Sequence, residues 1–290
     1  MKLNPISIIL VLPFLMEASS SIGAKSATSS PADDYLNAFR RAEEETKIFS
    51  PITDFSHDVS ISDAYEAQKR ILAYRLANAD HIAGYKGGLM SAKSLSDKRV
   101  NQPITGMLFL SGSLLSPATA SLCGYRRAAF EMKIGYVFGA SVGTPIATVD
   151  QVKALVSAVR PVVDLPDIAY RDENKYGAID MIAANISSSR FVEGTPRKPD
   201  TIDLDALTAS ITRDGAPVTR GTGKESLGGQ WESLRTLINI IVANGGHIEK
   251  GWIVLTGKIG DKGLAMPGHY LADYGPLGDV QFQVQACPRL

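Results

Sequence analysis

The sequence predicts an α+β fold, in which a small helical N-terminal region precedes a β-rich body with two or three helices packed on it. Two observations lead to this prediction. Apolar residues recur at helical spacing in only a few segments of the chain. Short apolar runs bounded by turn residues fill most of the remaining sequence, as is typical of strands.

Four segments carry the helical pattern: Asp33–Lys47, a segment from Ser62 or Asp63 to Ala77, Thr148–Val159 and Gln230–Ala243. Ser62 or Asp63 is expected to cap the second helix, because short polar side chains accept hydrogen bonds from the first free backbone N–H groups. Thr148 and Gln151 form a capping-box pattern before the third helix. Gly245 and Gly246 follow the fourth helix, where glycine is the usual terminating residue.

The predicted strands are short, and glycine or polar residues bound most of them. They are Ala83–Gly87, Arg127–Phe138, Val162–Ala169, Ile186–Val192, Trp252–Thr256, Tyr270–Tyr274 and Val280–Val284. A further segment, Ile211–Val218, contains Asp214-Gly215 near its centre. An Asp-Gly pair favours the tight turn of a hairpin, so we expect this segment to fold back on itself.

Composition limits the class of protein. Of the 290 residues, 44% are hydrophobic and 21% are charged, which is typical of a globular chain and excludes disorder as its main state. The 30 Lys and Arg balance the 30 Asp and Glu, so no basic excess is present to neutralise nucleic-acid phosphates. We divide the chain into an N-terminal segment 1–24, a linker 25–31, a helical region 32–80 and a body 81–290.

Residues 1–24 have the pattern of a secretory signal peptide. Lys2 gives a short positive region, Ile6–Met16 is an apolar core, and small residues follow between Ala18 and Ala24. The core is shorter than the roughly 20 residues of a membrane span. We therefore expect cleavage near residues 18–24 and a periplasmic or secreted protein without a stable membrane span. An uncleaved N-terminal anchor is the alternative.

Cysteine and histidine give little support for a metal site. Export to an oxidising compartment would allow Cys123 and Cys287 to form one disulfide, and two free thiols are the alternative. The four histidines are far apart in sequence, and the chain has no Cys-x-x-Cys motif. A zinc site built on these residues is not expected.

Glu131 and Asp164 are the acidic residues of most interest, because each lies within a predicted apolar strand. A carboxylate in such a strand must be paired, coordinate an ion or face water. Periodicity alone leaves the water-facing alternative open. The glycine-rich runs at 84–88, 221–224, 228–229 and 257–260 are each interpreted singly as turns or helix caps, and the second lacks the spacing of a phosphate-binding P-loop.

Five segments together carry a resemblance to a known family. Gly84–Ser91 resembles a G-x-K-I-G-L-T-S motif, and the other four resemble A-Y-x-x-Q, E-x-E-x-A-F-V-L, P-A-x-E-I and I-x-L-T-G motifs: Ala64–Gln68, Phe130–Phe138, Arg160–Leu165 and Trp252–Gly257. These motifs are similar to those of the 2-oxopent-4-enoate hydratase and 4-oxalocrotonate decarboxylase family. That family belongs to the fumarylacetoacetate hydrolase-like superfamily. The resemblance extends from about residue 34 to 284.

The resemblance implies a fold and a chemistry. The body would be a mixed β-roll or barrel of the fumarylacetoacetase C-terminal type, usually assembled as a homo-oligomer. The family holds Mg²⁺ or Mn²⁺ with three carboxylates and acts on small 2-oxo or 2-hydroxydienoic acids formed in the catabolism of aromatic compounds. Residues i and i+2 of a strand point the same way, so an E-x-E motif aims two carboxylates at one ion.

Site residues are carried over from the family motifs position by position. Lys86 occupies the position of the family lysine, Glu131 the first acidic position and Asp164 the third. The resemblance therefore implies metal ligation by Glu131 and Asp164, and catalytic roles for Lys86, Glu131 and Lys133. It also implies substrate binding by Ser91, Thr256 and Gly257. Lys258 stands where the family often has a small hydroxyl residue, and its added positive charge suits an anionic ligand.

Lys133 is the most informative departure, because it occupies the second acidic position. A protonated lysine repels Mg²⁺ and cannot ligate it, which makes a bound Mg²⁺ or Mn²⁺ doubtful. Two carboxylates with one ammonium carry the same formal charge as three carboxylates with one dication. We therefore expect Lys133 to take the place of the ion, paired with Glu131 and Asp164. The alternative is that Lys133 extends into solvent and that two carboxylates retain a metal weakly.

Two functions of different class follow from these residues. The leading hypothesis is a lyase, a hydratase or decarboxylase-like enzyme acting on a small 2-oxo acid through an enolate at an altered metal site. The alternative is an exported non-catalytic binding protein for small carboxylates, which keeps the pocket without the metal. Hydrolysis of an acylpyruvate is a weaker third hypothesis, since no histidine lies near Glu131 in the sequence.

Overall fold

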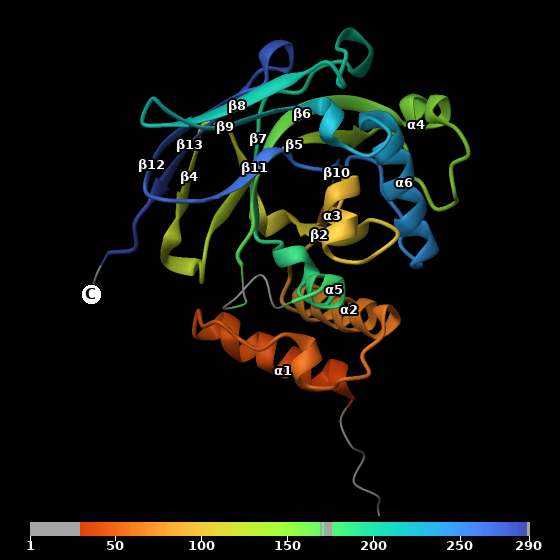
Figure 1. Ribbon diagram of the computed structural model, residues 1–290, viewed down its shortest axis with the longest axis vertical. Coiled ribbons are helices and arrows are strands. Elements are labelled where there is room, and N and C mark those ends of the chain that lie inside the picture. Colours follow the sequence, from red (N-terminus) through yellow and green to blue (C-terminus); the bar gives the residue numbers. More distant parts are fainter. Residues whose placement is uncertain (1–29, 169, 171–175, 289–290) are drawn as a thin grey trace, which may run out of the picture.

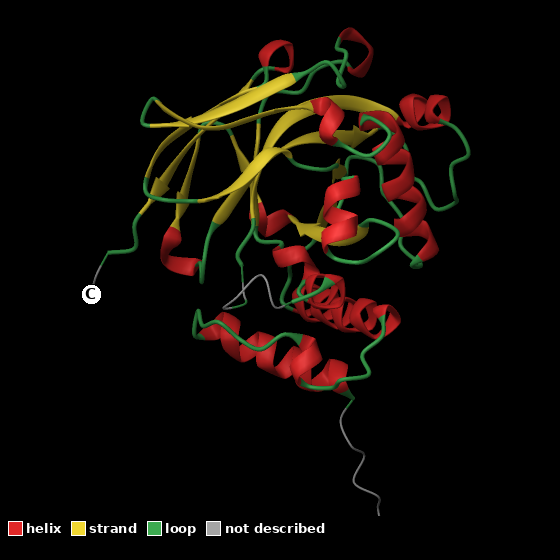
Figure 2. Ribbon diagram, viewed as in Figure 1, coloured by secondary structure: helices red, strands yellow, loops and turns green. Residues whose placement is uncertain are grey.

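The computed structural model describes residues 30–168, 170 and 176–288. Two β-sheets curl into a half-barrel, and helices α1 and α2 lie together below it (Figure 1). Figure 2 shows that the strands are confined to the upper part of the molecule in this view. The predicted mixed α+β fold with a small helical N-terminal region is confirmed, whereas the domain bounds 32–80 and 81–290 stay a prediction.

The larger sheet has the strand order β2-β1-β10-β5-β6-β7-β3. Strand β11 pairs with the N-terminal part of β5, from Ala129 to Met132. Its strands are β1 (Ile82–Gly88), β2 (Ile104–Phe109), β3 (Ser113–Leu115), β5 (Ala129–Phe138), β6 (Val156–Leu165), β7 (Arg190–Glu193), β10 (Ile253–Leu255) and β11 (Ile259–Leu264). The antiparallel pair β5–β6 is the longest ladder and sets Glu131 directly opposite Asp164. Most residues of both strands are buried, and most of these are apolar.

The smaller sheet has the order β4-β13-β12-β8-β9. Its strands are β4 (Ala118–Ser121), β8 (Thr208–Arg213), β9 (Ala216–Thr222), β12 (Gly268–Asp273) and β13 (Asp279–Gln285). The hairpin predicted around Asp214-Gly215 is present as β8–β9. Cys123 and Cys287 form a disulfide, which ties the end of β4 to the segment after β13. Of the two alternatives for these cysteines, the structure has the paired one.

The helices are α1 (Pro31–Glu44), α2 (Ile61–Ala77), α3 (Ala92–Asp97), α4 (Val149–Leu155), α5 (Ala178–Ala183) and α6 (Gln230–Ala243). Helix α6 packs on the larger sheet through Leu234, Leu237, Ile238 and Ile241, all of which are buried in the main core. A second core joins α1, α2 and α5 and includes Ile104 of β2. The helical region is thus packed directly on the body. No helix among the described residues is long and apolar enough to cross a membrane.

Helix α2 begins two or three residues earlier than predicted. Ser60 is its N-cap, rather than Ser62 or Asp63, and its hydroxyl accepts from the backbone N–H of Asp63. The Asp63 carboxylate in turn accepts from the backbone N–H of Ser60. Asp63 is therefore the second half of a capping box.

Helix α4 is shorter than predicted, because Val156–Val159 belong to a strand instead. The helix ends at Leu155 and β6 begins at Val156, with no loop between them. Valines at 156 and 159 suit both a helical face and a buried strand, so spacing alone did not separate the two. Strand β6 ends at Leu165, before Pro166, and the predicted strand end at Ala169 lies outside the described residues.

The strand predicted at Ile186–Val192 is wrong in its first half. Asn185, Ile186 and Ser187 all have positive φ, at 52°, 50° and 53°, and form a left-handed turn before β7. The Asn185 side chain holds this turn against β2 by bonding both the N–H and the C=O of Met107. A tertiary contact of this kind leaves no signal in local sequence.

Candidate active site

Lys86 and Asp164 form an ion pair inside the curled sheet. Lys86 projects from β1, and its Nζ lies 2.8 Å from Oδ2 of Asp164 on β6. Both side chains are almost fully buried, at 2% and 1% exposure. Strands β10 and β5 separate β1 from β6 in the sheet order, so the curl of the sheet must bring these two side chains together. Oδ1 of Asp164 is buried without a hydrogen-bond partner among the described residues.

Glu131 and Lys133 form a second pair on β5. They are two residues apart on one strand and therefore share a face. Nζ of Lys133 lies 3.0 Å from Oε2 of Glu131. The same ammonium also donates longer hydrogen bonds to the backbone carbonyls of Thr256 and Gly87, at 3.4 and 3.5 Å. Lys133 is therefore held inside the protein, and the alternative in which it extends into solvent does not apply.

The charges of the neighbouring lysines change the pKa of Glu131. Burial of the Glu131 carboxyl alone would raise its pKa. The ammonium groups of Lys133 and Lys86 outweigh that effect and hold the pKa of Glu131 below its usual value of 4.5. Glu131 is thus an ionised carboxylate at neutral pH. Its side chain is 20% exposed, which leaves it more accessible than the lysine with which it pairs.

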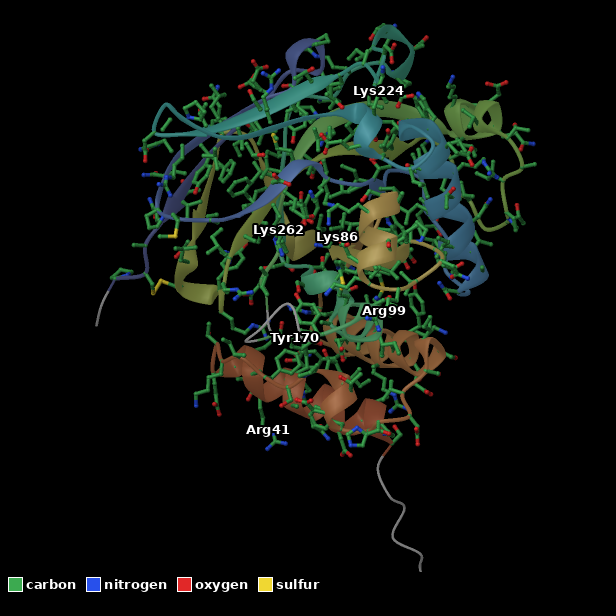
Figure 3. All side chains as sticks on the ribbon, viewed as in Figure 1. Arg41, Lys86, Arg99, Tyr170, Lys224 and Lys262 are labelled. Carbon is green, nitrogen blue, oxygen red and sulfur yellow. A yellow bond between two sulfur atoms is a disulfide. The ribbon has the colours of Figure 1, made fainter. Side chains whose placement is uncertain are left out.

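A cavity of about 440 Å³ opens onto this cluster. Lys86, Glu131 and Lys133 line it, together with Ser91, Gly257 and Lys258 from the predicted site. Lys262 on β11 also lines it, and Figure 3 shows Lys86 and Lys262 toward the middle of the body. The cavity therefore collects residues from β1, β5 and β11, and from the segments after β1 and β10, which are far apart in sequence.

The predicted substrate-binding residues differ in their placement. Ser91 lines the cavity and is also the N-cap of α3, where its hydroxyl accepts from the backbone N–H of Ser94. Gly257 lines the cavity with its backbone. Thr256 is buried behind the cavity wall, and its hydroxyl donates to Oε1 of Gln230 at 2.8 Å. The position of Thr256 therefore favours a role in positioning the wall rather than in contacting a ligand.

Sequence reasoning missed two polar side chains of this region. Glu225 lines the cavity, and its carboxylate accepts from the backbone N–H groups of Thr222 and Gly260. Gln230 is fully buried and links Thr256 to the carbonyl of Gly223. The Gly228-Gly229 pair that opens α6 was the available signal for Gln230, but it was interpreted as a helix cap.

The glycines around Lys86 mainly allow close packing within the protein. Gly84 has a φ of 152°, and a Cβ placed on it would lie 1.7 Å from the carbonyl oxygen of Ile253 on β10. A Cβ on Gly257 would lie 2.7 Å from the Cβ of Met90. Both glycines therefore let two segments of the cavity wall approach each other.

The donor set does not fit a divalent cation as the residues stand. Glu131 and Asp164, the ligands that the resemblance implies for a metal ion, each have a lysine ammonium at 2.8–3.0 Å. No group of three or more His, Cys, Asp or Glu side chains suited to a metal occurs among the described residues. Lys133 pairs with Glu131 alone, while Asp164 pairs with Lys86, so the predicted contact between Lys133 and Asp164 is absent from the described hydrogen bonds and ion pairs.

Comparison with known proteins gives relatives that span most of the chain. A 2-keto-4-pentenoate hydratase from Paraburkholderia xenovorans is 27% identical over 243 residues, which cover 83% of this chain and 90% of the relative. A 4-oxalocrotonate decarboxylase from Pseudomonas sp. is 29% identical over 220 residues, which cover 75% and 83%. The chain is thus similar over most of its length to 2-keto-4-pentenoate hydratases and 4-oxalocrotonate decarboxylases, the proteins that its sequence motifs resemble. No family model matches the chain.

Solved structures show the same similarity. A 4-oxalocrotonate decarboxylase from Pseudomonas putida, complexed with magnesium and adipate, superposes with a TM-score of 0.84 at 26% identity over 89% of this chain and 99% of that one. A fumarylacetoacetate hydrolase family protein from Yersinia pestis gives a TM-score of 0.55 at 13% identity over 70% and 93%. The second likeness concerns the fold alone. Solved members of the hydratase and decarboxylase family thus include metal-bound enzymes, and the expectation of a lyase is supported.

The same comparisons correct the predicted location. The expectation of a periplasmic or secreted protein is wrong, because the relatives of this family are enzymes of small-molecule catabolism and lend no support to export. The apolar pattern of the first residues was given too much weight against the rest of the chain. The predicted signal peptide and most of the linker lie outside the described residues.

Proposed function

We propose that the protein is a lyase that adds water to, or removes carbon dioxide from, a small 2-oxo or 2-hydroxydienoic acid. The observation that carries this proposal is the cluster of Lys86, Asp164, Glu131 and Lys133 at a cavity of about 440 Å³. The hydratase and decarboxylase relatives support the same reaction class. Both reactions pass through an enolate, whose negative charge must be stabilised.

The lysines are proposed to supply that stabilisation. In the family arrangement, a carboxylate and a dication together contribute one net positive charge at the position that Lys133 occupies here. The Lys133 ammonium contributes the same net charge by itself. Lys86 adds a second buried ammonium at 2% exposure, where a fixed charge acts more strongly than in water. Together they favour the enolate over the neutral ketone without a Lewis acid at this position.

Glu131 is proposed to handle the proton or orient the attacking water. It is the more exposed partner of its pair and remains ionised at neutral pH, because the neighbouring ammonium groups lower its pKa. An ionised carboxylate accepts hydrogen bonds and so can hold a water molecule against the substrate. Asp164, at 1% exposure, acts on Lys86 instead and fixes the direction of its ammonium.

Turnover assays test this proposal. Purified protein is offered 2-hydroxypenta-2,4-dienoate and 4-oxalocrotonate, each with EDTA and each with Mg²⁺. We expect turnover of at least one substrate, retained in EDTA and lost on Glu131→Gln. Arg235→Gln, on the surface of α6, serves as the control and should keep activity.

Two results would overturn parts of the proposal. Turnover that disappears in EDTA and returns with Mg²⁺ would mean that Lys133 does not replace the ion. Binding of the acids without turnover of either one would contradict the proposed lyase activity. It would favour the alternative hypothesis of a non-catalytic binding protein.

A further inference from the structure

A second polar cavity, of about 350 Å³, lies where the helical region meets the body. Its walls include Glu43 of α1, Arg75 of α2, Arg190 of β7, and Arg126, Asp167 and Ser188 from loops of the body. In Figure 1 this junction lies between the paired helices α1 and α2 and the strands above them. None of these side chains takes part in the chemistry proposed above.

Three buried polar atoms on residues that line this cavity have no hydrogen-bond partner among the described residues. They are Nε of Arg75, Nη1 of Arg126 and Oγ of Ser188. The Arg126 side chain is only 8% exposed, and its Nε is already engaged at 2.7 Å by Asp167. Buried polar atoms are normally hydrogen-bonded, so an unpartnered nitrogen on a buried guanidinium that lines a cavity indicates a missing partner.

The charges at the cavity identify the chemistry of that partner. Arg75, Arg126 and Arg190 contribute three positive charges, whereas Glu43 and Asp167 contribute two negative ones. Each acid is already paired, Glu43 with Arg75 and Asp167 with Arg126. The remaining positive charge and the free guanidinium edge both favour an oxygen-bearing anion, since arginine donates to such oxygens with well-matched geometry.

We propose that this cavity is a second ligand site, which binds a small oxyanion, a phosphate or carboxylate group, through Arg126 and Ser188. The site is separate from the candidate active site, although the two cavities share Ser187 in their walls. Ser187 ends the left-handed turn that begins at Asn185. The proposed oxyanion site and the candidate active site therefore border the same turn.

Thermal unfolding of the full chain tests the proposal, with inorganic phosphate and succinate as probes and sodium chloride at matched ionic strength as the reference. An anion that binds only the folded state raises Tm in a saturable way. We expect phosphate, succinate or both to raise the Tm of the wild type beyond the chloride reference. A shift with phosphate alone identifies a phosphate group, and a shift with succinate alone identifies a carboxylate.

Two variants assign the effect to this cavity. Arg126→Gln removes the guanidinium and should abolish the saturable shift. Because it also breaks the pair with Asp167 and lowers basal stability, Ser188→Ala is the second variant. It removes one unsatisfied hydroxyl, so the protein should fold normally while the apparent dissociation constant rises about fivefold to tenfold, the scale of one lost hydrogen bond. Ser157→Ala, on β6 outside the cavity, is its matched control and should behave as the wild type.

The proposal is overturned if phosphate and succinate leave the Tm of the wild type at the chloride value, in which case the cavity holds water only. It is equally overturned if Ser188→Ala and Arg126→Gln both keep the full shift of the wild type. In that case the anion binds elsewhere, for example at the lysines of the candidate active site. Neither result bears on the turnover assays.

Discussion

Lys86 and Asp164 depend on each other, because each would otherwise be a lone charge in the interior. We predict that Lys86→Met lowers the free energy of unfolding by about 3–5 kcal/mol, since it leaves the Asp164 carboxylate buried without its partner. The double variant Lys86→Met/Asp164→Asn should recover most of that loss. Urea denaturation measures both. Equal losses in the single and double variants would mean that the pair is not coupled.

Substitution of Lys133 tests whether its ammonium group takes the place of a metal ion. Lys133→Glu would place three carboxylates together, a repulsion that a dication relieves. We predict that Mg²⁺ or Mn²⁺ raises the Tm of Lys133→Glu and leaves that of the wild type nearly unchanged. Lys133→Gln, which removes the charge without adding a carboxylate, is the matched control and should not respond. The same metal shift in all three proteins would place Lys133 outside the binding site.

Glu131 gives the site a pH dependence of known sign. Its pKa is lower in the folded protein than its usual value of 4.5, so its contribution to stability is complete above that pH and declines as the pH falls through the folded pKa. We predict that the Tm difference between the wild type and Glu131→Gln is constant from pH 8 to pH 5.5 and shrinks below about pH 4.5. Scanning calorimetry over this range checks it. A difference that grows on acidification would reverse the sign of the shift.

Only part of the candidate site was predictable from individual residues. The shared face of Glu131 and Lys133 follows from their two-residue spacing on a strand. The contact between Lys86 and Asp164 does not, because they are 78 residues apart and meet only through the order and curl of the strands. The hydrogen bond between Thr256 and Gln230 was not predictable either, since the two residues are brought together only by the fold. The assigned roles of the site residues stay predictions.

At the scale of the elements, the packing of β1 against β10 depends on a single glycine, Gly84. Gly84 allows β1 to approach β10 so closely that any Cβ would collide with the backbone of Ile253. We predict that Gly84→Ala lowers the free energy of unfolding by more than about 3 kcal/mol, through strain at positive φ and a separation of the two strands. Gly143→Ala is the control, because a Cβ there meets nothing within 4 Å. Chemical denaturation of the two variants should therefore give clearly different midpoints.

The predicted elements differ in how well local sequence specified them. Helix α6 has the predicted bounds, because an apolar stripe, a start signal and a glycine stop all agree. Strand β2 was not predicted, although all of its residues are buried, because a short apolar run without alternation has no distinct period. The left-handed turn at Asn185–Ser187 was placed inside a strand, since its conformation is imposed by contacts with β2.

At the scale of the whole molecule, the fold class was predictable but the arrangement of the sheets was not. The mixed α+β architecture followed from counting helical and strand-like segments. The parallel pairing of β1 with β10 joins residues about 170 positions apart, and local periodicity carries no information on such partners. The expectation that the strands form a β-roll or barrel came from the family resemblance and not from periodicity. The predicted homo-oligomer is untested and stays a prediction.

The disulfide has a consequence for the connectivity of the chain. Cys123 and Cys287 are 164 residues apart, so the covalent structure is a large ring that carries residues 1–122 as a tail. A single cut anywhere in the ring opens it without releasing a fragment. We predict that limited trypsin cleavage after Arg213, beside the exposed turn between β8 and β9, yields one band on a gel without reductant and two bands with it. In Cys123→Ser, the same cut should give two bands in either case.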